Sequence, residues 1–335
     1  MEFGIEKLAT SFLYTKIDTL LCIILYTIKF CQTYKINFIS PKLQKHKIYT
    51  HFCNMIIFKE ASTLHQYIES KKKGGLSIGF VPTMGALHKG HISLIKESNT
   101  QCDITVCSIF VNPTQFNDAN DFAKYPVTID KDISLLEENN ASILFLPSVK
   151  EMYPQGTDLK ENYQLGYLET ILEGAYRPGH FQGVCQVVQR LLEIVVPDNL
   201  FMGQKDYQQC MVLKKMMKDE GIKAHMVILP THRETSGLAM SSRNMRLSNE
   251  GLVKATAISK TLAAIKEEIR PGELTTICAK AKEALLSSGF EKVDYVSITK
   301  ADTLELIEFW DGNISLIALI AATIEGVRLI DNLLL

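Results

Sequence analysis

The 335-residue chain has little excess charge of either sign and no long apolar run. Its formal net charge is -1 at pH 7, with 46% hydrophobic and 22% charged residues, which is typical of an ordinary globular protein. The longest apolar run of the N-terminal region, residues 20–28, falls well short of the roughly 20 residues that a membrane-spanning helix needs. We therefore expect neither a nucleic-acid partner nor a membrane partner.

The eight cysteines form no Cys-x-x-Cys pair, and the chain contains no internal repeat or low-complexity tract. Unpaired cysteines argue against a zinc ribbon, and a chain of this length does not need disulfide staples. Scattered thiols are typical of a reducing compartment, so we expect a cytoplasmic protein.

Residues 1–54 differ in composition from the rest. They carry seven lysines against three acidic residues and contain no arginine. The missing arginines argue against a mitochondrial presequence, and the segment lacks the early apolar run and cleavage site of a secretory signal. We expect the natural chain to start at Met55, with residues 1–54 an N-terminal extension outside the fold.

From Met55 onward, strand-like and helical segments alternate. Apolar runs at 76–81, 104–111, 143–146, 199–202 and 224–229 are separated by helical patterns, which predicts parallel strands with ligands bound beyond their carboxyl ends. After Pro230 the pattern changes to two helical stretches (252–269 and 274–286) and two strands (293–298 and 314–322). We predict an α/β fold: a Rossmann-like parallel sheet with helices on both faces (55–230), followed by a smaller C-terminal α+β domain (231–335) that can close over the cleft.

Residues 79–98 predict a strand, a tight loop and a helix N-terminus. The strand is expected to stop at Pro82, and the loop delivers His88 and His91 to the first turn of the helix. Such a junction is a natural anion site, because unpaired backbone N–H groups meet the positive end of the helix dipole. The histidines can bind phosphates, or they can be surface residues without a role. Metal ligation is disfavoured because no further ligand follows at suitable spacing.

Other polar residues lie at loops on the same predicted rim, and each has an ordinary explanation beside a functional one. Lys205 can neutralise phosphates or lie in a solvated turn, and Asp206 can meet a ribose hydroxyl or cap a helix. The run Ser241-Ser242-Arg243 can grip a polyphosphate or cap the helix near Leu252. Gln115 and Gln209 carry amides able to hold a carboxylate or hydroxyls, although a single glutamine says little.

Five segments, in order, resemble the motifs of the pantothenate synthetase (pantoate–β-alanine ligase) family, within the His-x-Gly-His nucleotidyltransferase superfamily. They are VPTMGALHKGH (81–91), SIFVNPTQF (108–116), LEG with RPGHF (172–181), GQKDYQQ (203–209) and GLAMSSRN (237–244). The likeness covers essentially all of residues 55–335.

The resemblance implies an ATP-dependent ligase that condenses (R)-pantoate with β-alanine. The implied products are pantothenate, AMP and pyrophosphate, formed through a pantoyl adenylate. ATP is then a substrate, Mg²⁺ is required with ligands that the sequence does not identify, and the protein is a homodimer. The alternative is another His-x-Gly-His nucleotidyltransferase that activates a different small acid.

The resemblance also implies roles for individual residues. His91, His88, Lys205 and Arg243 would be catalytic, and Gln115 and Gln209 would hold pantoate, with Gln115 also bordering β-alanine. The implied ATP-binding residues are Met84, Gly85, Ala86, Leu87, His88, Lys89, Gly90, His91, Gly203, Gln204, Lys205, Asp206, His232, Met240, Ser241, Ser242 and Arg243. The implied supporting residues are Asn112, Tyr125, Arg177 and His180.

Two positions depart from the family pattern. Ser236 stands where many relatives have Asp, and His232 lies where an apolar residue often packs beside adenine. The packing of adenine is therefore the part of the implied site most open to change.

Overall fold

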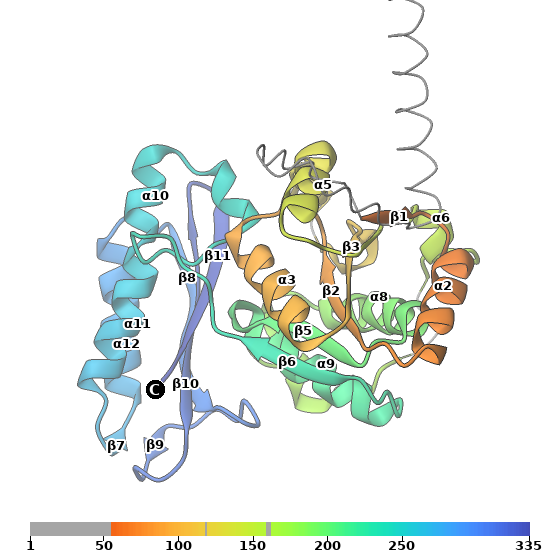
Figure 1. Cartoon of the computed structure of the whole chain (residues 1–335). Helices are drawn as coiled ribbons and strands as arrows, with labels where there is room; N and C mark the ends of the chain where they lie inside the picture. The colour runs from red at the N-terminus through yellow and green to blue at the C-terminus, as the bar shows by residue number, and fades with distance from the viewer. Residues whose placement is uncertain (1–54, 118, 159–161) are drawn as a thin grey trace, which may run out of the picture. The chain divides into compact units, whose positions relative to one another are not determined.

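The computed structural model describes residues 55–117, 119–158 and 162–335, and these residues belong to one compact unit (Figure 1). The expectations for the extension at residues 1–54 lie outside the described residues. Within the described part, no helix combines the length and the apolar character needed to cross a membrane.

Six parallel strands form the first sheet, in the order β1-β4-β3-β2-β5-β6, which confirms the predicted parallel sheet. The strands are β1 (Ile56–Phe58), β2 (Ile78–Thr83), β3 (Ile104–Ile109), β4 (Ile143–Phe145), β5 (Asn199–Gly203) and β6 (His225–Leu229). The chain runs from β2 outward to β3 and β4, then returns to place β5 on the other side of β2. The strand order therefore switches between β2 and β5, where a ligand crevice is expected beyond their carboxyl ends.

Helices cover both faces of this sheet, as predicted. One face carries α2 (Ala61–Lys73), α8 (His180–Val195) and α9 (Tyr207–Asp219), and the other carries α3 (Lys89–Gln101) and α5 (Ile129–Glu138). Side chains alternate along β2, so Phe80 packs in the core beneath α8 while Val81 packs in the core beneath α3. All of β3 is buried, which explains its continuous apolar run.

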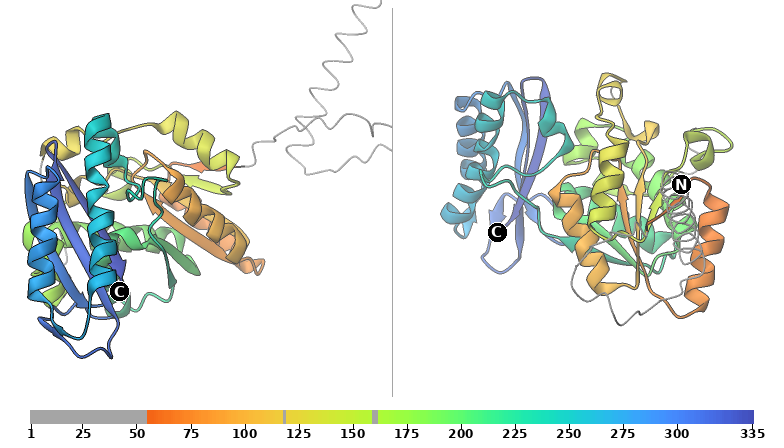
Figure 2. Two further views of the ribbon diagram at one scale, coloured as in Figure 1. Left: turned by 90° about the vertical axis from the view of Figure 1, so that its left-hand side faces the viewer. Right: turned by 45° about the horizontal axis from the view of Figure 1, so that its top comes forward.

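A second, antiparallel sheet follows in the order β11-β10-β8, from β8 (Lys292–Lys300), β10 (Leu316–Ile324) and β11 (Val327–Leu334). Helices α11 (Ala257–Glu268) and α12 (Thr275–Ser287) pack on one face, and in Figures 1 and 2 the sheet stands between these helices and the parallel sheet. This confirms the α+β character of the C-terminal part, and the boundary between 230 and 231 stays a prediction.

The remaining elements are short. They are η1 (Pro113–Gln115), α4 (Ala119–Ala123), α6 (Val149–Met152), η2 (Gly166–Glu169), α7 (Leu172–Tyr176), η3 (Gln204–Asp206), η4 (Ser242–Arg246), α10 (Asn249–Ala255), β7 (Gly272–Glu273) and β9 (Phe309–Trp310).

Several details differ from the sequence-based expectations. The three-residue edge strand β1 was not predicted, because so short a run has no readable period. The expected helix at 252–269 is divided at Thr256 into α10 and α11. Strand β11, which also went unpredicted, lies at the edge of the second sheet and bears several residues of the site described below.

Strand β2 does not stop at Pro82 but continues to Thr83. Ile78 accepts a hydrogen bond from Asp198 on the β5 side, so every second residue after it, including Pro82, turns its backbone toward β5. The pairing of β2 with β5 ends at Phe80, whereas the pairing with β3 extends to Thr83. Pro82 has no N–H to donate toward β5 and lies where that pairing has ended, whereas the pairing with β3 continues past it.

Candidate active site

Asp132, from α5, holds the loop that follows β2. Its carboxylate is fully buried and accepts hydrogen bonds from the amides of Ala86 and Leu87, at N–O distances of 2.9 and 2.8 Å. The Thr128 hydroxyl donates to the same carboxylate at 3.0 Å. These bonds hold a left-handed turn, with φ of +80° at Gly85 and +48° at Ala86. The shape of the loop is thus imposed by a side chain from another helix.

His88 and His91 form a reciprocal cap at the N-terminus of α3. The amide of His88 donates to Nδ1 of His91, and the amide of Gly90 donates to Nδ1 of His88, each at 3.2 Å. Because each Nδ1 accepts, the proton of each neutral ring lies on Nε2. We expected the backbone N–H groups of this loop to be free to bind an anion. The amides of Ala86, Leu87, His88 and Gly90 are instead hydrogen-bonded within the protein, so that part of the expectation is wrong. The loop offers imidazole Nε2–H groups instead.

The pKa of both imidazoles is lowered. Burial, followed by the charge of Lys205, lowers the pKa of His88 to about 4. Burial, followed by His88 and then Lys205, holds the pKa of His91 well below its usual 6.5. Both rings are neutral at pH 7 in this structure, so they act as hydrogen-bond donors and not as cations.

Lys205 lies on η3, directly beyond the carboxyl end of β5. Its side chain is largely buried, and Nζ lies 3.4 Å from Oδ1 of Asp206. The loop after β2 and the turn after β5 therefore bring the two histidines and this lysine to the crevice where the strand order switches.

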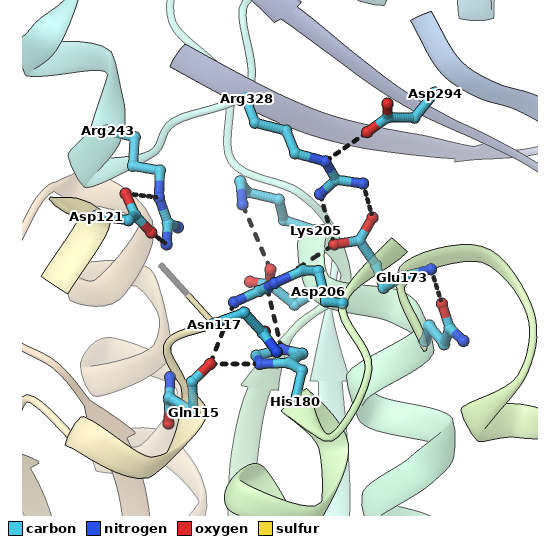
Figure 3. A network of polar contacts seen from close by, with 12 residues as sticks. Gln115, Asn117, Asp121, Glu173, His180, Lys205, Asp206, Arg243, Asp294 and Arg328 are labelled. Carbon is cyan, nitrogen blue, oxygen red and sulfur yellow. Dashed lines mark hydrogen bonds and ion pairs between the residues drawn. The ribbon is translucent and has the colours of Figure 1, made fainter. Parts of the chain in front are cut away.

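Arg243, on η4, forms an ion pair with Asp121 of α4. Its Nη2 lies 2.7 Å from Asp121 Oδ2 (Figure 3). Arg246 Nη1 lies 2.7 Å from Asp121 Oδ1. The Ser242 hydroxyl donates to the carbonyl of Ala86 at 3.1 Å. This bond ties the loop of the C-terminal part directly to the histidine loop.

Two of the ordinary explanations considered above are not observed. The N-cap of α10 is Ser248, so the run Ser241-Ser242-Arg243 does not cap the helix near Leu252. Ser241 caps the short helix η4, where its hydroxyl accepts from the amide of Arg243 at 3.3 Å. Asp206 occupies the N-cap position of α9 but makes no side-chain capping bond there. Both segments line the cavity instead.

Gln115 is held at the carboxyl-end side of β3 by the predicted supporting residues. Its carbonyl accepts from His180 Nδ1 at 2.8 Å (Figure 3) and from Arg177 Nη2 at 3.3 Å. Asn112 Nδ2 donates to its Oε1 at 3.2 Å. His180 Nε2 lies 3.0 Å from Arg177 Nη1. Burial, followed by Arg177, lowers the pKa of His180 to about 4, so this ring is also neutral. Gln209, on α9, lines the same cavity.

A cavity of about 240 Å³ collects these segments. The predicted site residues that line it are Met84, His88, Gly90, His91, Gln115, Gly203, Lys205, Asp206, Gln209, His232, Met240, Ser241, Ser242 and Arg243. A second cavity of about 360 Å³ shares Lys205, Asp206 and Arg243 with the first. Gly85, Ala86, Leu87, Lys89 and Gln204 were predicted to bind ATP but are not among the lining residues of either cavity.

The family model described as pantoate-beta-alanine ligase matches residues 56–334. The chain belongs to the pantoate–β-alanine ligase family. The pantothenate synthetase of Cytophaga hutchinsonii is 43% identical over 283 residues, which are 84% of this chain and 99% of that protein. The pantothenate synthetase of Hydrogenovibrio crunogenus is 41% identical over 282 residues, or 84% of this chain and 99% of that protein.

Solved structures of the family agree with this assignment. The pantothenate synthetase of Thermus thermophilus superposes with a TM-score of 0.75 at 37% identity, covering 83% of this chain and 99% of that one. The pantoate–β-alanine ligase of Francisella tularensis, solved in complex with β-γ ATP and β-alanine, gives a TM-score of 0.70 at 40% identity over 84% of this chain and 97% of that one. The chain is therefore an ATP-dependent ligase that joins pantoate to β-alanine.

Several polar residues that shape the ligase site were not predicted to belong to it. They are Asp121, Asp132, Glu173, Arg328 and Asn332. Glu173 lies in one of the five matching segments and could have been found there. Asp121 and Asp132 are acidic residues in helical segments, where such residues usually lie on the face exposed to solvent. Arg328 and Asn332 lie on β11, 155 and 127 positions from groups that they bind, and no local pattern indicates contacts at such separations.

Proposed function

We propose that this ligase works through a pantoyl adenylate, with the two cavities holding ATP and pantoate side by side. In the first step a pantoate carboxylate oxygen attacks the α-phosphorus of ATP, the bond from that phosphorus to the bridging oxygen breaks, and pyrophosphate leaves. In the second step the amine of β-alanine attacks the acyl carbon, and AMP leaves. The observation that carries the proposal is one cavity lined by His88, His91, Lys205 and Arg243 together with two glutamines.

His88 and His91 act in this proposal as neutral donors. Their Nε2–H groups can bond phosphate oxygens whose negative charge grows during displacement, without the cost of desolvating an imidazolium. The family resemblance assigns proton donation to His91. Its lowered pKa means that it enters the reaction as a neutral ring, and binding of the phosphates would raise the pKa of both histidines.

Lys205 and Arg243 are the cations of the proposed triphosphate site. Lys205 can neutralise charge as a point donor, whereas Arg243 can bind phosphate oxygens with its planar fork. The hydroxyls of Ser241 and Ser242 lie beside Arg243 in the same cavity wall. Together these groups would stabilise the leaving pyrophosphate.

Gln115 and Gln209 are proposed to hold pantoate, and Gln115 also to border the β-alanine site. Amides can orient the nucleophilic carboxylate without neutralising it, so its oxygen stays reactive. The bonds from His180, Arg177 and Asn112 would keep Gln115 in place for this purpose.

Mg²⁺ is part of the proposal as a companion of the ATP phosphates. The described residues contain no group of three or more His, Cys, Asp or Glu side chains arranged around a common metal position. Mg²⁺ bound to nucleotides commonly uses only one or two protein carboxylates, with phosphates and water as its other ligands. Of the acids lining the first cavity, Glu173 is buried and paired with Arg328 at 2.7 Å, whereas Asp206 is more exposed and has only a long 3.4 Å contact with Lys205, so Asp206 is the residue that would hold the ion.

A homodimer formed through the larger domain, a cytoplasmic location and a division into domains at 55–230 and 231–335 complete the proposal. The dimer rests on the family resemblance. The location rests on the free thiols of Cys102, Cys107, Cys185, Cys210 and Cys278 in the described residues. Sedimentation equilibrium of the purified protein would test the dimer.

The decisive assay is pantoate-dependent exchange of labelled pyrophosphate into ATP. Exchange should require pantoate and Mg²⁺ but not β-alanine, and pantothenate should form only after β-alanine is added. Pantothenate formation without any pantoate-dependent exchange would contradict the adenylate mechanism.

A further inference from the structure

Asn332, near the end of β11, is almost completely buried and directs its amide at the turn that bears Lys205. Its Nδ2 donates to the carbonyls of Gln204 and Lys205, both at 2.9 Å, and its Oδ1 accepts from Gln204 Nε2 at 3.1 Å. Every one of these bonds crosses from the second sheet to η3, at the carboxyl end of the first.

The orientation of this amide is unambiguous. Two carbonyl oxygens can be satisfied only by the NH₂ group, so Oδ1 must be the atom that accepts from Gln204. The hydrogen bonds of the Asn332 side chain therefore all go to the η3 turn. No other residue type of similar size supplies two donors and an acceptor in this arrangement.

Asn332 is itself held firmly. Its backbone amide donates to Oδ1 of Asp331 at 2.8 Å, and the carboxylate of Asp331 is gripped by both Nη atoms of Arg233, at 2.5 and 3.0 Å. Arg233 also donates to the carbonyl of Gly237. β11 is thereby tied to the segment leading into Met240–Arg243 as well as to the Lys205 turn.

The Lys205 side chain has little that orients it. Its ion-pair partner in the described part of the chain is Asp206, whose carboxylate is 46% exposed, at a long 3.4 Å. A lysine on a flexible stem reaches a defined point only when its backbone origin is held in place. The side-chain amide of Asn332, on β11, holds that backbone by binding the carbonyls of Gln204 and Lys205.

We propose that Asn332 is a positioning residue for adenylation, holding the η3 turn so that Lys205 meets the ATP phosphates. The inference rests on the role proposed above for Lys205. It also makes docking of β11 a condition for a competent nucleotide site, because the lysine comes from the first sheet and the asparagine from the second.

The test uses Asn332→Leu, which keeps the volume but leaves two carbonyls without donors. In the pyrophosphate-exchange assay, kcat/KM for ATP should fall on the order of 10- to 100-fold, as expected when a reacting group shifts by about 1 Å. The loss should include a raised KM for ATP, while the KM for β-alanine in the complete reaction stays within about twofold. A merely unstable enzyme would lose active molecules and kcat without a change in KM. Asn249→Leu, at an exposed position of α10, is the matched control and should behave as wild type.

Lys205→Met separates the two ideas. If Asn332 acts through Lys205, then adding Asn332→Leu to Lys205→Met should reduce kcat/KM less than about threefold further. Two results would overturn the inference while leaving the role of Lys205 intact. One is a double variant in which the losses of kcat/KM from the two substitutions multiply, and the other is an Asn332→Leu enzyme whose kcat/KM for ATP is within about twofold of wild type. Unchanged exchange by Lys205→Met would refute the role of Lys205, and the inference with it. Should Asn332→Leu not fold, Asn332→Ser leaves room for water and should show the same pattern with a smaller loss of kcat/KM.

Discussion

Replacing Asp132 by asparagine should weaken both the fold and the active site. The carboxylate accepts from two consecutive amides and a hydroxyl inside the protein, with no exposure to solvent. An asparagine keeps one acceptor oxygen, but its NH₂ group then faces a backbone N–H. At least one charge-assisted bond is lost and one buried donor is left unpaired, so the free energy of unfolding should fall by about 2 to 4 kcal/mol.

Two measurements follow from this change. Thermal unfolding should occur about 5 to 10 °C lower, given the scaling of the midpoint with stability for domains of this size. In pyrophosphate exchange at a temperature where the variant is fully folded, kcat/KM for ATP should fall on the order of 10- to 100-fold, because the loop carries both histidines.

The control for this prediction is Asp130→Asn, an exposed position on the same helix. It should change the unfolding midpoint by less than about 2 °C and leave exchange unaltered, as is usual for surface substitutions. An Asp132→Asn enzyme whose midpoint and exchange match wild type would refute the view that this carboxylate sets the loop.

Three further predictions concern charge and catalysis. His91→Ala should lower kcat of exchange by about 100-fold or more, the usual cost of losing one transition-state donor, and an unchanged kcat would remove His91 from the chemistry. Asp121→Asn should raise the KM for ATP, because Arg243 loses the partner that orients it; an unaltered KM would show that Arg243 needs no such support. The free energy of unfolding should be fully retained above pH 6.5 and decline between pH 6.5 and about 4, because folding lowers the pKa of His88 and His180 and the unfolded chain takes up protons first. Urea titrations should show that His180→Gln makes this decline shallower, and an equal decline would contradict the assignment.

The sequence predicted the parts of this fold whose residues carry a local period. The continuous apolar run at 104–111 is typical of a strand covered on both faces, and β3 is buried throughout as expected. The apolar residues of α8 recur with the helical period of about 3.6 residues, and the helix buries that stripe. The edge strand β1 is too short to show a period. The break at Thr256 falls inside a continuous helical pattern, so only the packing of α10 and α11 against the second sheet reveals it.

The candidate site was predictable in its loops but not in what holds them. His88, Lys205 and Arg243 lie in three of the five segments that resemble the family's motifs, so the sequence alone indicated them. Their supports, Asp132 and Asn332, are single polar residues on elements remote in sequence, and their importance arises only when folding buries them against backbone groups. The hydrogen bonds from the loop amides to Asp132 could not be predicted either, because they too join residues remote in sequence.

Attack of the pantoate carboxylate on the α-phosphorus of ATP can be tested by following the carboxylate oxygens into the products. Pantoate labelled with ¹⁸O in its carboxylate should be converted with ATP, Mg²⁺ and β-alanine, and the products analysed by mass spectrometry. We expect one ¹⁸O atom in AMP for each pantothenate formed, because one carboxylate oxygen stays on the α-phosphorus when the acyl bond breaks. Label appearing in inorganic phosphate, with ADP as the nucleotide product, would contradict it.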